Sequence, residues 1–553
     1  MMEMENFYKQ FCHEAFDENG VLSAFEPVVA DNFNFAYDVV DEIARLDPDR
    51  RAMVWCNVAG EERTFTFGEM KLYSDKCAQM LTDYGVKKGD MVLLVLKRHY
   101  EFWFTVLALH KIGAVGVPAT NLLTTHDLIY RFKAASVTAC ICSGECNIAE
   151  YVEEACREYP DIHAKFLVRG TREGWLDYTK ELEKYDGAWQ RAQTHKNDPM
   201  LLYFTSGTTG MPKMVVHNMA YPVAHIITAR YWHNVHEDDL HLTVSETGWM
   251  KAVWGKLYGQ WLACASIFVY DFDKFVPHDL LHMMEKYHVT TFCAPPTIYR
   301  FFIKEGVKGY DLSSLRYSTT AGEALNPEVY NRWYEYTGLR LMESYGQTET
   351  VMQVANFVGT TPKPGSMGKP SPIYDIHLID EDGNDVPRGT VGEIVINTEK
   401  PHPGLFSGYY RNPKVTAESW HDGYYHTGDT AWMDEDGYLW YVGRTDDVIK
   451  SSGYRIGPFE IESVLMEHPA VLECAVTGAP DPVRGIVVKA TIVLTKKYQP
   501  SEELKKELQT YVKKQTAPYK YPRIVEFVTE LPKTISGKIR RTEIRARDND
   551  NQK

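Results

Sequence analysis

The sequence predicts a multi-domain α/β protein, with a large N-terminal domain of layered parallel sheets and helices and a small α+β C-terminal domain. Short apolar runs typical of buried strands alternate with helical patterns such as residues 102–112, which favours parallel sheets covered by helices. The chain of 553 residues is long enough for two to four folding units, at roughly 150 residues per domain. The strand-like runs of the large domain include residues 91–96, 138–142, 165–168 and 290–293.

A change in charge marks a domain boundary near residue 446. Residues 446–553 carry 19 basic and 15 acidic side chains, for a net charge of +4, whereas residues 1–445 carry 41 basic and 60 acidic side chains, for −19. The last hundred residues also have their own pattern of elements. We expect helices at 458–467 and 501–513, strands at 472–477 and 487–494, and a frayed polar tail at 545–553.

The composition argues against several classes of protein. A formal net charge of −15 disfavours nucleic-acid binding, which needs clustered Lys and Arg to neutralise phosphates. The longest purely aliphatic run, residues 91–96, is far shorter than the roughly 20 residues of a membrane-spanning helix. Residues 1–20 lack the pattern of a secretory signal, and the ten cysteines are irregularly spaced. We therefore expect a cytoplasmic protein with reduced thiols and without an integral membrane segment.

A loop of small residues between two strand-like runs is the most informative segment. Residues 205–213 read Thr-Ser-Gly-Thr-Thr-Gly-Met-Pro-Lys. The glycines leave backbone N–H groups open, and the hydroxyl groups and Lys213 add donors and a cation, which suits a loop around a triphosphate. The Walker pattern needs Lys directly after the last glycine, but Met211 and Pro212 intervene here. Taken alone, the segment could instead be an exposed turn.

This loop resembles the phosphate loop of the adenylate-forming superfamily, which includes acyl-CoA synthetases, luciferases and peptide-synthetase adenylation domains. Six further blocks are similar to the family's motifs and follow its order. They are Glu-Thr-Gly-Trp at 246–249, Ala-Gly-Glu-Ala-Leu at 321–325, Tyr-Gly-Gln-Thr-Glu at 345–349, Tyr-His-Thr-Gly-Asp at 425–429, Gly-Arg-Thr-Asp-Asp at 443–447 and Pro-Lys-Thr-Ile-Ser-Gly-Lys at 532–538. Segments 452–460, 480–485 and 516–522 look most like the AMP-forming medium-chain acyl-CoA synthetases.

The resemblance implies both a fold and a reaction. The large domain, residues 1–445, would include a β-barrel-like subdomain, and the small domain, residues 446–553, would be mobile about a hinge at Asp446. In the implied reaction, the carboxylate of a small acid attacks the α-phosphate of ATP, which gives an acyl-adenylate and pyrophosphate. The thiol of coenzyme A then displaces AMP. The resemblance thus implies ATP, Mg²⁺ and coenzyme A.

The matching motifs imply a set of nucleotide contacts. Glu349 would bind Mg²⁺, because a hard oxygen ligand suits that ion. Asp429 would accept hydrogen bonds from both ribose hydroxyls, Arg444 would assist at ribose or phosphate, and Thr348 would lie near the α-phosphate. The other implied ATP contacts are Thr205, Ser206, Gly207, Thr208, Thr209, Gly210 and Lys213 at the β- and γ-phosphates, Gly322 and Glu323 near adenine, and Glu343, Ser344, Tyr345, Gly346 and Gln347 along AMP.

The small domain is implied to have two working faces. Lys538 would be the catalytic residue of adenylation, acting with Thr348 and Glu349. Rotation about Asp446, which we count with the catalytic residues, would exchange the Lys538 face for the Gly453 face that serves thioester formation. The implied coenzyme A contacts are Ser452, Gly453, Tyr454 and Arg455, with Arg98, Arg484, Lys513 and Arg523 as candidates for its phosphates. For each of these last four, plain surface charge is an equal alternative.

The acyl pocket is expected around Gly346, Trp249 and Trp254. Acetate-specific relatives have Trp at the position of Gly346, so the glycine opens the site, although the nearby large rings can refill the space. Lys256 departs from the apolar residue usual in relatives. It could pair with a polar group of the substrate, but we expect it at the surface. We expect a short or branched aliphatic acid of roughly four to eight carbons.

Two alternatives to an acyl-CoA synthetase remain open. One is an adenylating ligase that transfers its acyl group to a carrier-protein thiol. The other is a regulatory nucleotide-binding protein that has kept the fold without the catalysis. The motifs favour the acid–thiol ligase, with small-molecule substrates and as a monomer or homo-oligomer.

Overall fold

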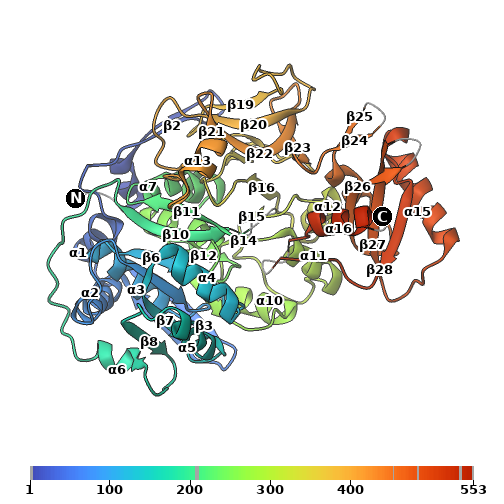
Figure 1. Cartoon of the computed structure of the whole chain (residues 1–553). Helices are drawn as coiled ribbons and strands as arrows, with labels where there is room; N and C mark the ends of the chain where they lie inside the picture. Colours follow the sequence, from blue (N-terminus) through green and yellow to red (C-terminus); the bar gives the residue numbers. More distant parts are fainter. Residues whose placement is uncertain (1–3, 206–210, 452–453, 482–484, 535–537, 551–553) are drawn as a thin grey trace.

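Two mainly parallel sheets form the large domain (Figure 1). The computed structural model describes residues 4–205, 211–451, 454–481, 485–534 and 538–550. The first sheet has the order β11-β10-β6-β5-β7-β8-β9, and β11 alone is antiparallel to its neighbour. Its strands are β5 (Met91–Val95), β6 (Val115–Pro118), β7 (Val137–Ser143), β8 (Ala164–Val168), β9 (Leu176–Asp177), β10 (Pro199–Thr205) and β11 (Lys213–Asn218).

The second sheet has the order β18-β17-β16-β15-β14-β12-β13-β3-β4, with antiparallel strands only at its two ends. Its strands are β3 (Arg51–Asn57), β4 (Glu62–Thr66), β12 (Leu240–Thr243), β13 (Ser266–Asp271), β14 (Thr291–Ala294), β15 (Tyr317–Ala321), β16 (Leu341–Tyr345), β17 (Val354–Ala355) and β18 (Lys369–Pro370). The strands expected at 91–96, 138–142, 165–168 and 290–293 are confirmed as β5, β7, β8 and β14.

Helices connect and cover these strands, as expected for parallel pairing. The expected helix at 102–112 is confirmed as α3 (Glu101–Ile112), which ends where Gly113 takes a left-handed conformation. The other helices of the large domain are η1 (Met4–Phe11), η2 (Ala36–Asp41), α1 (Glu42–Leu46), α2 (Phe67–Asp83), α4 (Thr125–Ala135), α5 (Ile148–Glu158), α6 (Tyr178–Leu182), α7 (Tyr221–Ile226), η3 (Ile227–Trp232), α8 (Lys251–Gly255), α9 (Tyr258–Leu262), α10 (Pro277–Lys286), α11 (Pro296–Glu305), α12 (Pro327–Thr337) and α13 (Pro413–Ser419). A short hairpin, β1 (Cys12–Phe16) and β2 (Leu22–Pro27), lies near the N-terminus.

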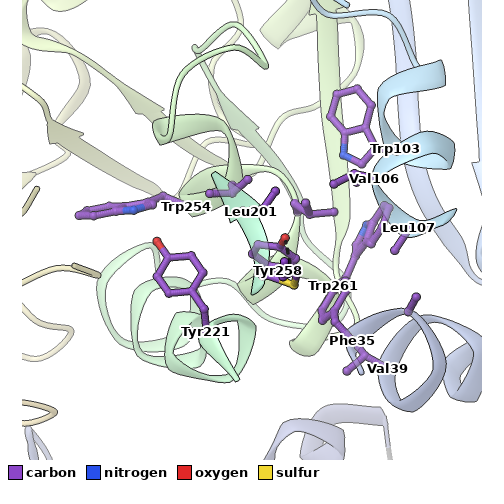
Figure 2. Packing of buried hydrophobic residues seen from close by; sticks show 14 of the residues in the cluster. Phe35, Val39, Trp103, Val106, Leu107, Leu201, Tyr221, Trp254, Tyr258 and Trp261 are labelled. Carbon is purple, nitrogen blue, oxygen red and sulfur yellow. Dashed lines mark hydrogen bonds between the residues drawn. The ribbon is translucent and has the colours of Figure 1, made fainter. Parts of the chain in front are cut away.

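Large aromatic side chains fill the core of this domain (Figure 2). Trp261 is fully buried, donates from Nε1 to the carbonyl of Ala52 at 3.0 Å, and stacks on Phe35. Tyr258 packs edge-on against the same Phe35 ring. These residues therefore hold the domain together, and Trp261 is part of the core.

The segment after β12 packs backbone to backbone against the first sheet. A β-carbon at Gly248 would come within 2.4 Å of the backbone of Ala119 and Thr120, so only glycine fits there. Directly before Gly248, Thr247 donates its N–H and its hydroxyl to the carbonyl of Lys97, and Glu246 accepts from the hydroxyl of Thr120. The Glu-Thr-Gly-Trp motif thus fastens the carboxyl edge of one sheet to that of the other.

A third, antiparallel sheet stands where the resemblance implies a barrel-like subdomain. It is built from β19 (Ile376–Ile379), β20 (Gly392–Asn397), β21 (Trp420–His421), β22 (Tyr424–Met433) and β23 (Leu439–Arg444). β23 leads directly into residues 445–447, so this sheet carries the chain to the small domain.

The C-terminal residues form a separate three-stranded sheet with its own hydrophobic core. That sheet consists of β26, β27 and β28, and β24 and β25 form a separate pair. The elements of this C-terminal part are β24 (Ile449–Ser451), β25 (Tyr454–Ile456), α14 (Pro458–Glu467), β26 (Val471–Asp481), β27 (Gly485–Leu494), α15 (Glu502–Gln515), η4 (Pro518–Lys520), β28 (Ile524–Val528) and α16 (Arg541–Asp550). The expected helices and strands are confirmed as α14, α15, β26 and β27. The expectation of a frayed tail is wrong for residues 545–550, because α16 continues through them and Arg545 pairs with Asp447.

Within the part of the chain that the structure describes, no helix is long and apolar enough to cross a membrane.

Candidate active site

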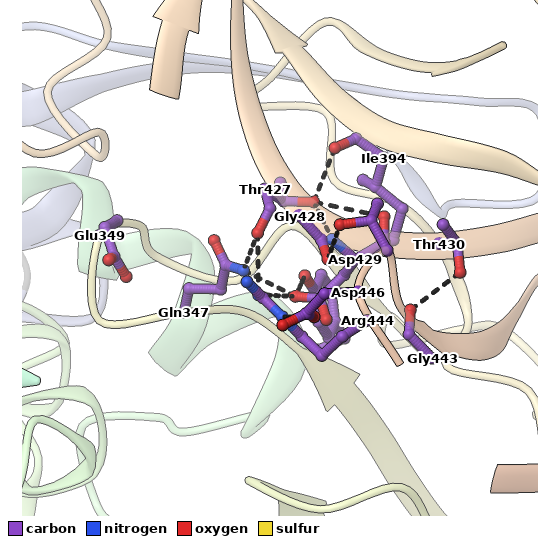
Figure 3. A network of polar contacts seen from close by, with 12 residues as sticks. Gln347, Glu349, Ile394, Thr427, Gly428, Asp429, Thr430, Gly443, Arg444 and Asp446 are labelled. Atoms are coloured by element: carbon purple, nitrogen blue, oxygen red, sulfur yellow. Dashed lines mark hydrogen bonds and ion pairs between the residues drawn. The ribbon is translucent and has the colours of Figure 1, made fainter. Parts of the chain in front are cut away.

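The Asp429 carboxylate is the centre of a polar network that joins three segments (Figure 3). Asp429 lies on β22 and is 5% exposed. One of its oxygens accepts from Tyr345 Oη at 2.6 Å and Gln347 Nε2 at 2.7 Å, and the other accepts from Tyr441 Oη at 3.0 Å. Arg444 Nη1 lies 3.4 Å from the first oxygen. Among the described contacts, the first oxygen already has its donors, whereas the second has one donor and can accept a further hydrogen bond. A ligand hydroxyl at the first oxygen would therefore have to replace a donor.

Glu349 and Lys213, the lysine of the phosphate loop, both contact the side chain of Tyr409. Tyr409 donates from Oη to Glu349 Oε1 at 2.9 Å, and the ammonium of Lys213 sits 4.9 Å from the centre of the Tyr409 ring. Burial raises the pKa of Glu349, an effect that Tyr409 and Lys213 partly offset. A cation close to this carboxylate would favour its ionised form.

Thr348 is held by a buried histidine. His217, on β11, bonds from Nε2 to the carbonyl oxygen of Thr348 at 2.7 Å. Burial lowers the pKa of His217 to about 3, so the ring is neutral and its Nε2–H donates to that carbonyl. This bond links the strand that follows the phosphate loop to the motif of residues 345–349.

Gly322, Glu323 and Glu343 lie at the ends of β15 and β16, which are neighbours in the sheet. Gly322 has a φ of +106°, a conformation that favours glycine. Glu323 is exposed and accepts from the hydroxyl of Thr297. Glu343 Oε1 accepts from the N–H of Leu325 at 3.0 Å, and burial raises the pKa of Glu343 to about 8. Glu343 is therefore a neutral acid near pH 7. Ser344, its neighbour on β16, is also buried.

Trp254 fills the space beside Gly346. A β-carbon at Gly346 would come within 2.4 Å of the tip of the Trp254 ring. Trp254 is 7% exposed, and its Nε1 has no hydrogen-bond partner among the described residues. Trp249 follows the Glu246 turn in the preceding segment, and its N–H donates to the carbonyl of Glu246. The space that the glycine opens is thus occupied by an aromatic ring, as the sequence allowed.

The expectation of a surface position for Lys256 is wrong. Lys256 is 2% exposed, and its ammonium donates to the carbonyl of Ser245 at the end of β12. Burial lowers the pKa of Lys256 well below its usual range, with a further lowering by Arg98. Local sequence gives no sign of this burial, because it results from Gly255, directly before it, packing against Thr243 on β12.

Arg98 is also more enclosed than a surface residue. It donates from Nη1 to the carbonyl of Phe272 at 2.8 Å and lies 4.1 Å over the Phe272 ring. Burial lowers its pKa, although Glu246 and Asp271 act in the opposite direction. Arg98 therefore lies in the large domain, just after the carboxyl end of β5 and close to Lys256. It does not belong to the group of candidate coenzyme A residues in the small domain.

The candidate coenzyme A residues of the small domain form two contacts. Tyr454, half exposed, stacks on Tyr519 at 4.1 Å. Lys513 and Arg523 both lie over the Tyr521 ring, at 5.5 and 4.9 Å. The backbone of Arg455 is part of β25. Ser452, Gly453 and Arg484, and Ser206, Gly207, Thr208, Thr209 and Gly210 of the phosphate loop, lie outside the described residues.

Lys538 and Asp446 are exposed. The Lys538 N–H donates to the Thr534 hydroxyl at 3.1 Å, shortly before α16. Asp446 is partly exposed and lies 3.8 Å from Arg444. The same Arg444 that faces Asp429 therefore also faces the residue at the expected hinge.

The sequence did not predict three further residues of this region. They are His217 and Tyr409, described above, and Lys251, whose ammonium donates to the carbonyl of Ala321 at 2.7 Å and whose pKa is lowered by burial. Tyr409 pairs with Val215 only through an isolated bridge between distant segments. Lys251 and Tyr409 carry no motif of their own, and only the three-dimensional arrangement brings them to the site.

Two family models match the chain. The AMP-binding enzyme model covers residues 40–410, and the AMP-binding enzyme C-terminal domain model covers residues 460–538. The chain is 44% identical over 526 residues to acyl-coenzyme A synthetase ACSM4, mitochondrial, of Homo sapiens, which covers 93% of this chain and 90% of the relative. It is 41% identical over 536 residues to acyl-coenzyme A synthetase ACSM3, mitochondrial, of Mus musculus, covering 95% and 92%.

Solved structures have the same fold. An anthranilate CoA ligase, AuaEII, in complex with anthranoyl-AMP is 29% identical, with a TM-score of 0.86 over 94% of this chain and 98% of that one. A benzoate CoA ligase from Burkholderia xenovorans LB400 is 26% identical, with a TM-score of 0.80 over 93% and 100%. Fold and sequence together define an enzyme of the adenylate-forming class. The chain belongs to the AMP-binding enzyme family, and within it to the group of AMP-forming medium-chain acyl-CoA synthetases.

The neutral state of Glu343 predicts a pH dependence of stability. Its folded pKa, about 8, lies above the ordinary value of 4.5, so its contribution is present below pH 4.5 and is lost as the pH rises toward 8. The loss is at most about 1.4 kcal/mol per pH unit. In Glu343→Gln the amide keeps the acceptor for Leu325 but does not ionise. The urea midpoint of the variant should therefore fall less than that of the wild type between pH 5 and pH 8, and parallel curves would contradict this account.

Proposed function

We propose that the protein is an AMP-forming acyl-CoA synthetase, which converts a carboxylic acid, ATP and coenzyme A into acyl-CoA, AMP and pyrophosphate through an acyl-adenylate. Family membership and the acyl-coenzyme A synthetases among its relatives support this reaction. The observation that carries the proposal is a series of contacts that links Lys213, Glu349 and Asp429. Lys213 lies over the Tyr409 ring, Tyr409 donates to Glu349, and Gln347, two residues before Glu349, donates to Asp429. These groups supply a cation for phosphates, a hard oxygen ligand and an acceptor for ribose.

Asp429 is proposed to bind the ribose. Its oxygens already accept from Tyr345, Gln347 and Tyr441, which compete with incoming ribose hydroxyls. Thr348 and Gln347 would follow AMP toward the α-phosphate, and Gly322 and Glu323 would border adenine. Lys213, with residues 205–210, would contact the β- and γ-phosphates, which it can neutralise in part.

Glu349 is proposed to hold Mg²⁺ together with phosphate oxygens. The chemistry of Glu349 fits this ion, because Mg²⁺ prefers oxygen ligands such as a carboxylate. One oxygen of Glu349 accepts from Tyr409, and a bound cation would favour the ionised form of the carboxylate. When bound, the ion would screen the negative charge of the triphosphate. Tyr409 holds the carboxylate in place.

Lys538 is proposed as the cation that assists adenylation, and Asp446 as the hinge of a rotating small domain with its boundary at residues 445–446. Helix α14 of the small domain packs against β23, and β24 and β25 lie at the upper edge of that domain in Figure 1. Asn326, at the start of α12, donates to the carbonyl of Ser463 on α14 at 3.1 Å. We propose that this contact between α12 and α14 belongs to the adenylation pose.

Coenzyme A is proposed to meet the large domain only after rotation of the small domain. Tyr454 with Tyr519 offers an exposed aromatic surface, and Lys513 with Arg523 offers two cations. The net charge of +4 in residues 446–553 suits anionic coenzyme A. Arg98 is proposed as a contact from the large domain, with less support, because its guanidinium already bonds to Phe272.

A short or branched aliphatic acid is proposed as the substrate. Trp254 occupies the space beside Gly346, which limits straight extension of the chain in that direction. Lys251 at Ala321 lies next to the proposed adenylate and could face the reacting carboxylate. The buried Lys256 pairs with Ser245, and a polar substrate group would have to compete with that bond.

The expected cytoplasmic location lacks support, since the curated relatives named above are mitochondrial proteins. Either compartment suits the proposed reaction, and immunodetection in separated cell fractions decides between them.

The two half-reactions test the proposed roles of the small-domain faces. Lys538→Ala should reduce acid-dependent exchange of pyrophosphate into ATP by about 10²-fold or more, because a positioned cation is lost. Its rate of thioester formation from supplied acyl-adenylate should stay near that of the wild type. Gly453→Leu should show the reverse. Equal losses in both half-reactions for both variants would contradict the rotation, and absence of exchange in the wild type with any acid would contradict an adenylating enzyme.

The size of the acid pocket is tested at Trp254. Trp254→Ala should shift the acid with the highest kcat/KM toward longer chains, since removal of the ring reopens the space beside Gly346. A methylene in such a pocket changes kcat/KM by about tenfold or more. A panel from acetate to decanoate, with branched and aromatic acids and with coenzyme A titrated, measures this. Trp440→Ala, which removes a ring stacked on Trp432 in the third sheet, is the matched control. An unchanged preference in Trp254→Ala would contradict the proposed pocket.

A further inference from the structure

A group of ion pairs surrounds the start of α16, outside the nucleotide site. Arg541 bonds from Nη2 to both oxygens of Glu462, at 2.8 and 2.7 Å, and its Nη1 lies 3.6 Å from Asp447 Oδ2. Arg545, one turn further along the helix, also pairs with Asp447. Glu462 and Asp447 have side chains only 11% and 10% exposed. A two-bonded Arg–carboxylate pair in such an enclosed place has a fixed geometry, unlike an exposed pair.

Each partner of Arg541 belongs to a different segment of the small domain. Glu462 lies on α14 and also accepts from the N–H of Val476 on β26 at 2.7 Å. Asp447 directly follows the proposed hinge residue, Asp446. The two contacts of Arg541, with that of Arg545, therefore attach the chain just after the hinge to α14, β26 and α16.

The other side of Arg541 leads back to Lys538, only three residues away. Residues 532–534 and 538–540, the two arms of the Lys538 hairpin, pair with each other. Arg540 N–H donates to the carbonyl of Pro532 and Thr534 N–H donates to that of Lys538, both at 2.8 Å. Lys533 and Ile539 are bridge partners across the same hairpin. The described arm 538–540 thus leads directly into α16, which begins at Arg541.

The chain just before the hinge is fixed separately. Arg444 bonds to the carbonyl of Thr427 at 3.0 Å and faces Asp429, both on β22. Two turn hydrogen bonds pass over Asp446, from the N–H groups of Asp447 and Val448 to the carbonyl of Arg444. Residues 445–446 therefore lie between one anchor in the third sheet and one anchor on α16, which is where a hinge at Asp446 would turn.

We propose that Arg541 is a positioning residue for adenylation. It fastens the Lys538 hairpin to Asp447, the residue directly after the hinge, so that Asp447 and the catalytic lysine rotate together as one rigid body. The inference rests on the proposed roles of Lys538 and Asp446. Without Arg541, rotation of the domain would bring the hairpin to the active site in a loose orientation. A misplacement of about 1 Å can reduce a rate by about 10²-fold.

Neighbouring arginines offer a matched experiment. Arg541→Gln removes the anchor. Arg540→Gln, at the preceding residue, removes an exposed charge that pairs with Glu543 three residues further along the chain. We expect Arg541→Gln to reduce acid-dependent pyrophosphate exchange at least about tenfold, mainly in kcat, with thioester formation from supplied acyl-adenylate within threefold of the wild type. Arg540→Gln should stay within twofold in both half-reactions. Equal losses in both half-reactions for Arg541→Gln, or behaviour like that of Arg540→Gln, would overturn the proposal.

Two further variants make the result decisive. If Arg541→Gln does not fold, as judged by circular dichroism and thermal melting, Arg545→Gln decides, because it weakens only the Asp447 contact. A selective loss of adenylation in Arg545→Gln supports the proposal, and its absence overturns it. Lys538→Ala is measured in parallel. If Lys538→Ala retains adenylation, the proposed function of that lysine fails; if it loses adenylation while the Arg541 and Arg545 variants do not, only the anchor fails.

Discussion

The hydrogen bonds of one carboxylate, Asp429, connect the parts of this enzyme that must act together. Asp429 belongs to the third sheet. Tyr345 ends β16 of the second sheet and Gln347 follows that strand, whereas Arg444 ends β23 two residues before Asp446. A buried carboxylate is costly unless its oxygens are satisfied, so these donors are drawn to one place. The nucleotide pocket and the proposed hinge consequently share a group, and neither can rearrange without affecting the other.

Close packing of backbone brings the remaining site residues to the same edge of the sheets. In open parallel sheets, ligands bind at the carboxyl ends of the strands. Gly248 lets the segment after β12 touch the end of β6, and Gly346 leaves room for the Trp254 ring. A side chain at either position would separate elements that now touch, so these glycines are requirements of packing and of the pocket at once.

The sequence predicted the parts of this structure that depend on local pattern or on motifs. Strands such as β5 and β7 and the helices α3, α14 and α15 follow from such signals. The roles of Lys213, Glu349 and Asp429 rest on motifs and stay predictions. The sequence did not predict contacts between distant segments. Lys256 looks like a surface residue until α8 is packed against β12, Tyr409 has no motif, and the polar residues 545–550 are helical because Arg545 finds Asp447. The proposed roles of the site residues are a chemical interpretation of these contacts.

The coupling between Asp429 and the hinge can be measured by amide hydrogen exchange of residues 443–448. The N–H groups of Asp447 and Val448 donate to Arg444, so their exchange reports on that turn. A non-hydrolysable acyl-adenylate analogue, at concentrations that saturate each protein, should change exchange in this segment of the wild type, because ribose displaces donors from Asp429. In Asp429→Asn the analogue should leave the segment unchanged. An equal change in both proteins would show that the hinge responds without Asp429 and would contradict the account.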